Sequence, residues 1–188
     1  MAVNPAIATV NWADGALELP GIRASEKKLG QLSAIFRDKQ ASQKIDPNTI
    51  VYRVWWWEPV PLGTEGGLLW GLTEIQPGCV GDEYYMTHGH RHAIANRAEF
   101  YGTSVGTGML VLCDASGQSR AEEMKPGSLH YIPGGTAHRV ANTGDVPLRF
   151  VACWPSDAGY DYDLAGSKGF GARVVKRNGA PVFELTEE

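Results

Sequence analysis

The sequence lacks long apolar runs and has few cysteines. No segment of the 188 residues approaches the ~18 consecutive apolar residues that a membrane-spanning helix needs. The three cysteines, Cys79, Cys113 and Cys153, are an odd number, and no two are spaced as a metal-binding pair. We therefore expect reduced core residues, as in a cytoplasmic protein, rather than a disulfide framework.

Positive charge is also scarce. Lysine and arginine number 17 against 21 acidic residues, which gives a net charge of −4. No basic patch indicates nucleic acid or an anionic membrane as a partner, and we expect neither. The opening stretch MAVNPAIATVNWADG has no basic segment followed by an apolar one. We therefore expect no signal peptide, and we expect a cytoplasmic location.

Turn residues and short strand-like segments dominate what is present. There are 23 glycines and 11 prolines. β-branched and aromatic residues recur in short runs between turn signals, a rhythm typical of a β-sandwich or barrel. The predicted strands cover residues 50–57, 68–75, 83–92, 99–106, 108–114, 119–125, 128–133, 138–144 and 148–155. A further hairpin is predicted around Asn178-Gly179.

One helix is predicted, over residues 25–39, with Ser25 as its N-cap. Its apolar positions recur at helical spacing, namely Leu29, Leu32, Ile35 and Phe36. The tryptophan run Trp55–Trp57 lies in a predicted strand, so its side chains alternate between two faces. We interpret one face as core and the other as a subunit contact.

Three of the five histidines fall in the stretch MTHGHRH, at His88, His90 and His92. On an extended strand, residues two apart share a face, so all three are expected to point the same way. Glu99 opens the next predicted strand and can return beside them, and His138 follows later. Clustered imidazoles with a carboxylate are typical metal ligands. His130, which stands alone, is interpreted as structural.

The spacing around His138 follows a known pattern. Gly127, Pro133, Gly135, His138 and Asn142 match every fixed position of the second cupin motif, G(X)5PXG(X)2H(X)3N. The first cupin motif contains HXH, then a glutamate, then six residues and a glycine. Glu99 and Gly106 fit its second half, but six residues separate His92 from Glu99, which is a longer gap than usual. The double motif predicts a mainly β, cupin-type barrel (jelly roll) with an N-terminal helix and extra strands.

This longer gap occurs in a particular branch. The segment EYYMTHGHRH, followed by AEFY and later by AHRVANTGDVPLRFVACWPSDAGYDY, resembles the cupin-type glucose-6-phosphate isomerases of archaea and some bacteria. The resemblance covers roughly residues 25–175. It implies a metal-dependent aldose–ketose isomerase that interconverts glucose 6-phosphate and fructose 6-phosphate. It also implies one divalent metal ion (Fe, Mn, Ni, Co or Zn), a sugar-phosphate substrate and a homodimer.

The resemblance also implies roles for individual residues. His90, His92, Glu99 and His138 would hold the metal, with Glu99 the catalytic proton carrier. The implied substrate contacts are Thr73, Thr87, Gly89, Tyr101 and Tyr162. His88 shares the expected inward face, so we add it as a residue near the substrate rather than on the metal. Trp154 and Tyr160 stand where the family has a tyrosine and a histidine, so the sequence predicts the metal chemistry more firmly than the substrate.

Two alternatives stay open at this point. The same ligand set suits a non-haem Fe(II) cupin dioxygenase, and a cupin can also bind a sugar phosphate without turning it over. As a domain organisation we expect a single cupin domain over residues 1–188. Its core barrel would span approximately 50–155, between an N-terminal helix/strand extension (1–49) and a C-terminal extension (156–188).

Overall fold

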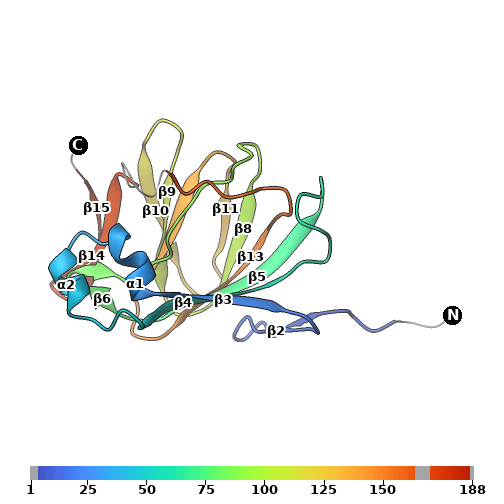
Figure 1. Ribbon diagram of the computed structural model, residues 1–188, viewed down its shortest axis with the longest axis horizontal. Helices are drawn as coiled ribbons and strands as arrows, with labels where there is room; N and C mark the ends of the chain where they lie inside the picture. The colour runs from blue at the N-terminus through green and yellow to red at the C-terminus, as the bar shows by residue number, and fades with distance from the viewer. Residues whose placement is uncertain (1–3, 164–169, 187–188) are drawn as a thin grey trace.

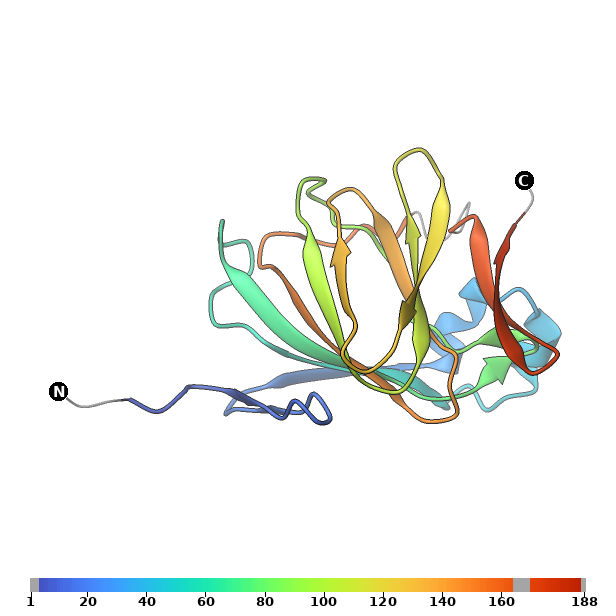
Figure 2. The ribbon, with the colours of Figure 1, turned by 180° about the vertical axis from the view of Figure 1, so that it is seen from behind.

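The computed structural model describes residues 4–163 and 170–186. Antiparallel strands curve around a common interior, which confirms the predicted mainly β, cupin-type barrel (Figure 1). Seen from behind, the chain before β3 runs out from the barrel, while the β14–β15 hairpin lies at the opposite end (Figure 2). The strands are β1 (Thr9–Val10), β2 (Leu17–Glu18), β3 (Arg23–Lys28), β4 (Ile50–Trp57), β5 (Leu68–Ile75), β6 (Cys79–Val80), β7 (Glu83–Tyr84), β8 (Glu99–Val105), β9 (Gly108–Cys113), β10 (Ser119–Met124), β11 (Leu129–Ile132), β12 (Ala137–Asn142), β13 (Leu148–Pro155), β14 (Ala172–Arg177) and β15 (Ala180–Leu185).

Two sheets form most of the barrel wall. The larger has the strand order β11-β8-β13-β5-β4-β3, and the smaller has the order β10-β9-β12. A four-stranded sheet, β15-β14-β7-β6, closes one end, and β1 pairs with β2 in a separate hairpin. The buried core lies between the sheets and includes Phe150, Leu110, Leu112, Met124 and Ile132, each no more than 2% exposed.

The register of the larger sheet shows which side chains face inward. Trp56 pairs with Gly71 and lines the interior cavity, while Trp55 and Trp57 point to the outer face. Gly71 leaves room there, because a Cβ on it would lie 3.0 Å from the ring of Trp154. The predicted alternation of the tryptophan run is therefore confirmed, with one of the three rings facing the interior.

The predicted helix over residues 25–39 is wrong in its extent. Residues up to Lys28 belong to β3, which pairs with β4 at the edge of the sheet, so Ser25 is a strand residue and caps nothing. Within residues 25–43, only α1 (Leu29–Leu32), a 3-10 turn (Ser33–Ile35) and α2 (Lys39–Gln43) are helical. Leu29, Leu32, Ile35 and Phe36 are buried as the periodicity predicted. Strand pairing satisfies the backbone of β3 and overrides a weak helical preference.

The histidine segment is not a regular strand either. Of residues 83–92, only β7 is strand, and the rest touches β12 through isolated bridges, Met86 to Ala141 and His90 to His138. Gly89 breaks the pleat with a φ of +79°, a conformation that glycine adopts without steric cost. The expectation that three histidines share a strand face is therefore wrong for the backbone, although all three side chains line the same cavity.

The hairpin predicted around Asn178-Gly179 is confirmed. It joins β14 to β15, and both turn residues have positive φ, 51° and 83°. That pair of angles suits the two-residue turn whose twist matches the flanking strands. β14 also pairs with β7 through Val175 and Glu83, so the hairpin extends the sheet next to the histidine segment.

Glu83 ties this hairpin to the N-terminal helices. Its side chain is fully buried, and its carboxylate accepts hydrogen bonds from the Arg173 guanidinium and the Arg37 backbone N–H. Glu83→Gln removes the charge that balances a buried contact, so we expect the free energy of unfolding to fall by about 3–5 kcal/mol. Urea unfolding measures this. Glu123→Gln, in an exposed pair with Lys125, is the control and should change stability by less than about 1 kcal/mol.

Across the described residues, no helix has both the length and the apolar character to cross a membrane. Cys79, Cys113 and Cys153 are all free thiols, but they are half-buried and not the core residues that the sequence predicted.

Candidate metal centre

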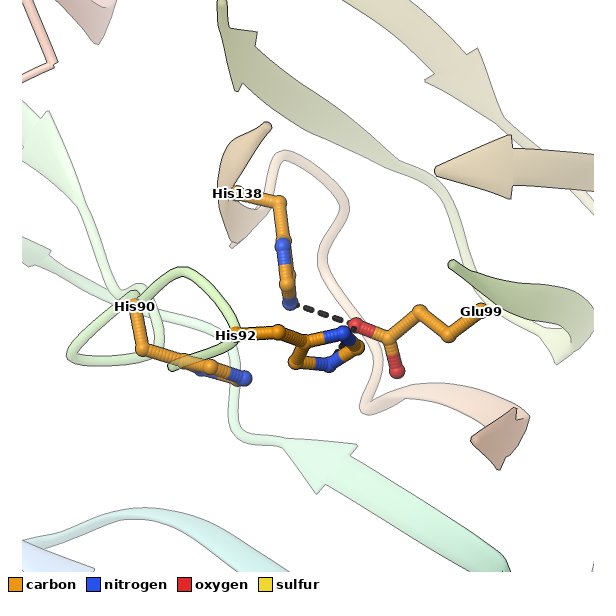
Figure 3. A group of neighbouring side chains, drawn as sticks. All are labelled: His90, His92, Glu99 and His138. Carbon is orange, nitrogen blue, oxygen red and sulfur yellow. Dashed lines mark ion pairs between the residues drawn. The ribbon is translucent and has the colours of Figure 1, made fainter. Parts of the chain in front are cut away.

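Four side chains from three parts of the chain meet inside the barrel. His90 and His92 come from the segment after β7, Glu99 opens β8, and His138 lies on β12 (Figure 3). Each offers one ligand atom, and these atoms all lie within 4.8 Å of one another. His92, Glu99 and His138 are each no more than 5% exposed. The structure therefore brings together the four residues that the sequence selected as metal ligands.

Backbone carbonyls orient two of the imidazoles. The Nδ1 of His92 lies 2.7 Å from the Arg97 carbonyl, and the Nδ1 of His138 lies 3.2 Å from the Thr136 carbonyl. A carbonyl only accepts hydrogen bonds, so each Nδ1 carries the proton and each Nε2 is left with a lone pair. Both Nε2 atoms point toward Glu99.

These lone pairs meet another acceptor instead of a donor. His138 Nε2 lies 2.6 Å and His92 Nε2 lies 3.4 Å from Oε1 of Glu99. Within the described part of the chain, none of these three buried atoms has a hydrogen-bond partner. Buried acceptors that converge without a donor need a cation or a shared proton. The donor set of three imidazoles and a carboxylate therefore fits a divalent metal ion.

The pKa directions of Glu99 and His90 agree with this assignment, whereas that of His92, in the absence of a metal, favours a proton shared with Glu99. Burial alone would raise the pKa of Glu99, but the facing imidazoles of His138 and His92 outweigh it and hold that pKa well below its usual range. Burial, with His138 adding to it, lowers the pKa of His90 to about 3. Burial would also lower the pKa of His92, but its contact with Glu99 raises it overall. An ionised carboxylate beside the neutral ring of His90 is a protonation state that a metal requires.

The loop between His92 and Glu99 is anchored from outside the cavity. Arg97, whose carbonyl orients His92, forms a two-pronged ion pair with Asp157, at 2.9 and 2.7 Å. The backbone N–H of Ile94 donates to the Ala158 carbonyl, which ties the same loop to the segment after β13. The long gap in the first cupin motif thus folds into a support for a metal-ligating histidine.

We expect Asp157→Asn to weaken metal binding about tenfold, because it loosens the Arg97 carbonyl that fixes the His92 ring. Titration of the metal-free protein with Mn²⁺ or Zn²⁺, followed calorimetrically, measures the effect. Glu184→Gln is the matched control, since it alters a similar two-pronged pair, with Arg177, and neither residue lines the cavity. Equal metal affinities in Asp157→Asn and the unmodified protein would show that the loop needs no such anchor.

A cavity of about 340 Å³ opens onto the four ligands. The sequence-predicted substrate residues all line it, namely Thr73, Thr87, His88, Gly89, Tyr101 and Tyr162. Trp154 and Tyr160, the two departures from the family pattern, line it as well. His88 is not among the four clustered ligands; its ring packs edge-on against Tyr162, with centroids 5.3 Å apart.

Two of these residues are prepared to donate to a ligand. The Thr87 hydroxyl oxygen accepts a hydrogen bond from the Val140 N–H, which leaves its proton available. Gly89 is required where it stands, because a Cβ there would lie 2.7 Å from the Phe170 ring and 3.1 Å from the Arg139 Cβ. A residue with a side chain would therefore not fit at this position.

Sequence reasoning missed several cavity residues. Ser25 and Lys27 reach the cavity from β3, which had been predicted as helix. Tyr52 and Trp56 reach it from β4, and the alternating pattern of that strand could have indicated them. Arg139 also lines the cavity; it lies in the AHR segment that carried the family resemblance, next to His138, but no role was assigned to it.

The fold and the site together define the class of this protein: it is a cupin with a buried candidate metal site of three histidines and one glutamate. The family model for glucose-6-phosphate isomerase matches residues 26–184, and the chain belongs to that family. It is 39% identical to glucose-6-phosphate isomerase of Thermococcus litoralis over 164 residues, which cover 86% of this chain and 85% of the relative. It is 37% identical to the enzyme of Pyrococcus furiosus over 174 residues, which cover 90% and 89%.

Among solved structures, the chain is similar to oxalate decarboxylase from Bacillus subtilis at pH 4.6, with a TM-score of 0.47 and 23% identity. The match covers 58% of this chain and 26% of the decarboxylase chain, so this chain spans about a quarter of its length.

Proposed function

We propose that this chain interconverts glucose 6-phosphate and fructose 6-phosphate with the help of one divalent metal ion. The observation that carries the proposal is the meeting of His90, His92, Glu99 and His138 at the base of the cavity, within the segment that the family model matches. The residues with substrate roles in the family resemblance line the same cavity.

The four clustered side chains would hold the ion. When bound there, it supplies Lewis-acid chemistry, which makes the hydrogen on the carbon next to a carbonyl group more acidic. Three imidazoles and a carboxylate suit Fe, Mn, Ni, Co or Zn, and we propose that the native ion is one of these.

We assign the movement of the proton between C2 and C1 of the sugar to Glu99. Its carboxylate is ionised because the neighbouring imidazoles hold its pKa low. Tyr101 lies beside it, and burial together with the Glu99 charge raises the pKa of the Tyr101 hydroxyl well above its usual range. Tyr101 therefore stays neutral, and its hydroxyl can donate a hydrogen bond to a sugar oxygen or to the carboxylate itself.

The phosphate end of the substrate would be held by neutral donors. We assign this contact to the hydroxyls of Thr73, Thr87 and Tyr162 and to the amide of Gly89. His88 lies against Tyr162 and away from the clustered ligands, so we assign it to the substrate side of the cavity.

A coupled assay for fructose 6-phosphate tests the proposal. We expect no product from glucose 6-phosphate after treatment with a chelator, and product again after Mn, Fe, Ni, Co or Zn is added. Full activity after complete metal removal would overturn the metal dependence. Oxygen uptake with no isomer formed would instead support a dioxygenase, and ligand-induced stabilisation with no isomer formed would support a binding protein.

We further propose a homodimer, formed through the outer face of the larger sheet. The register lines up Tyr131, Phe100, Cys153, Trp70 and Trp57 in one row across that face. Phe100 is 46% exposed and Tyr131 is 54% exposed, an apolar surface that a partner would cover. Light scattering should give twice the chain mass of 20.4 kDa, and Tyr131→Glu should give the monomer.

The organisation as one cupin domain and a cytoplasmic location complete the proposal. The free thiols support a reducing compartment.

A further inference from the structure

Arg139 is a buried arginine with no carboxylate beside it. The residue is only 8% exposed. Its Nε and Nη2 both donate to one acceptor, the backbone carbonyl of His88, at 3.2 and 2.7 Å. Among residues 4–163 and 170–186, no carboxylate oxygen lies within 4.0 Å of its guanidinium. A charge that is buried in this way is costly unless something compensates it.

The surrounding groups do not balance the charge. Phe170 covers one face of the guanidinium, with its ring centroid 4.4 Å away, which gives a modest cation–π attraction. Glu83 is the acidic group whose charge reaches Arg139, but its carboxylate is already paired with Arg173. Arg173 itself repels Arg139, and together with burial this lowers the Arg139 pKa to about 10. Arg139 therefore remains charged at neutral pH.

The same residue borders the cavity. Arg139 lines it together with Thr87, His88 and Gly89, the segment whose hydroxyl and amide are available to a ligand. Lys27 is a second cationic lining residue; it stands on β3 directly opposite Tyr52, and it has no ion pair within the described part of the chain. The clustered ligands contribute the carboxylate of Glu99 to the same lining.

We propose that Arg139 is the counter-ion of the substrate's phosphate group, which completes a charge balance that the protein alone leaves open. This inference rests on the proposed function and deepens it, because neutral hydroxyls and amides can orient a phosphate but cannot neutralise its two negative charges. The guanidinium is positioned in advance by the His88 carbonyl and Phe170, so little conformational entropy is lost on binding.

The consequence is selectivity for charged sugars. A neutral sugar in the same cavity would leave Arg139 buried and uncompensated, a state that costs binding energy without any clash. The phosphate therefore contributes to recognition through charge as well as through hydrogen bonds.

Two variants separate this role from a purely structural one. Arg139→Gln removes the charge but keeps an amide that can donate to the His88 carbonyl, while Arg139→Lys keeps the charge with a poorer fit. The metal-free proteins are titrated with glucose 6-phosphate. We expect Arg139→Gln to bind about 10–100-fold more weakly, and Arg139→Lys to retain most of the affinity. Arg120→Gln, which removes a half-exposed arginine of β10, is the control.

The outcomes each decide the question. Equal losses in Arg139→Gln and Arg139→Lys would show that Arg139 only braces the His88 carbonyl, and an unchanged affinity in Arg139→Gln would overturn the proposal outright. Thermal melts and metal content report whether each variant is folded.

A measurement on the unmodified protein needs no variant at all. Inorganic phosphate should raise the melting temperature of the metal-free protein more than sodium chloride does at equal ionic strength, by mass action on a built anion site. No difference between the two salts would count against the proposal. The protein could also bind phosphate in a way that depends on Arg139 and yet form no fructose 6-phosphate. That result would support the anion site and overturn only the isomerase function.

Discussion

Replacing Glu99 by glutamine is expected to lower turnover of glucose 6-phosphate by about 100- to 10,000-fold, the range of a lost proton-transfer group. The amide has nearly the shape of the carboxylate but cannot take a proton from carbon. Steady-state kinetics with the metal-reconstituted protein measure the loss.

The Glu99 variant should remain folded. In the unmodified chain, Glu99 Oε1 faces two imidazole lone pairs with no donor between them. The glutamine side chain brings an NH₂ group that can donate to those lone pairs, so the metal-free variant should melt no lower than the metal-free parent. This expected stability distinguishes a loss of chemistry from a loss of structure.

Glu122→Gln is the matched control. Glu122 also contacts a histidine, since its carboxylate lies 2.8 Å from Nδ1 of His130, but neither residue lines the cavity. The turnover of Glu122→Gln should therefore equal that of the unmodified protein. If Glu99→Gln keeps its metal and more than about a tenth of the parental turnover, another group carries the proton and the role of Glu99 is wrong.

The metal ligands could be predicted from the sequence because spacing constrains them strongly. Gly127, Pro133, Gly135, His138 and Asn142 had to agree with one motif at once, and several of these positions meet a structural requirement of the barrel. Gly127 and Gly135 both have positive φ, 87° and 74°. Asn142 is another example, because its side chain donates to the carbonyls of both Ile75 and Val146 and joins two strands.

The ends of the N-terminal helix could not be predicted in the same way. Leu29, Leu32, Ile35 and Phe36 are buried as predicted, but burial periodicity does not reveal where a neighbouring strand captures the backbone. β3 exists because β4 offers its edge, a partner more than twenty residues away. The local sequence does not indicate that pairing. Ser25 and Lys27 were therefore predicted to be helical, and their position beside the cavity was missed.

Arg139 was missed for a different reason. Its neighbour His138 belongs to a recognisable motif, whereas the significance of Arg139 depends on which charges are absent around it. Only the structure shows that Glu83 is already paired with Arg173 and that Arg139 is one of the residues lining the cavity. An unbalanced charge is a property of the packed molecule, and spacing along the chain does not encode it.

His92→Ala is expected to lose its bound metal, and His88→Ala is expected to keep it. The Nε2 of His92 is one of the converging ligand atoms, so its removal should weaken metal binding by more than about 100-fold, beyond the effect of losing a supporting contact. His88 lies against Tyr162 outside the cluster, and its loss should raise KM for glucose 6-phosphate several-fold while metal content stays at the parental level. Elemental analysis after dialysis, together with steady-state kinetics, measures both effects.

His130→Ala completes the comparison. His130 is buried between Glu122 and Ser128, so its removal should lower stability without altering metal content or KM. The three variants remove the same side chain from a ligand position, a cavity position and a structural position, and each should change a different quantity. Metal lost from His88→Ala but retained in His92→Ala would mean that the wrong pair of histidines has been assigned. The proton carried by Nδ1 of His92, held by the Arg97 carbonyl, argues against that outcome, because it directs the lone pair of Nε2 at Glu99.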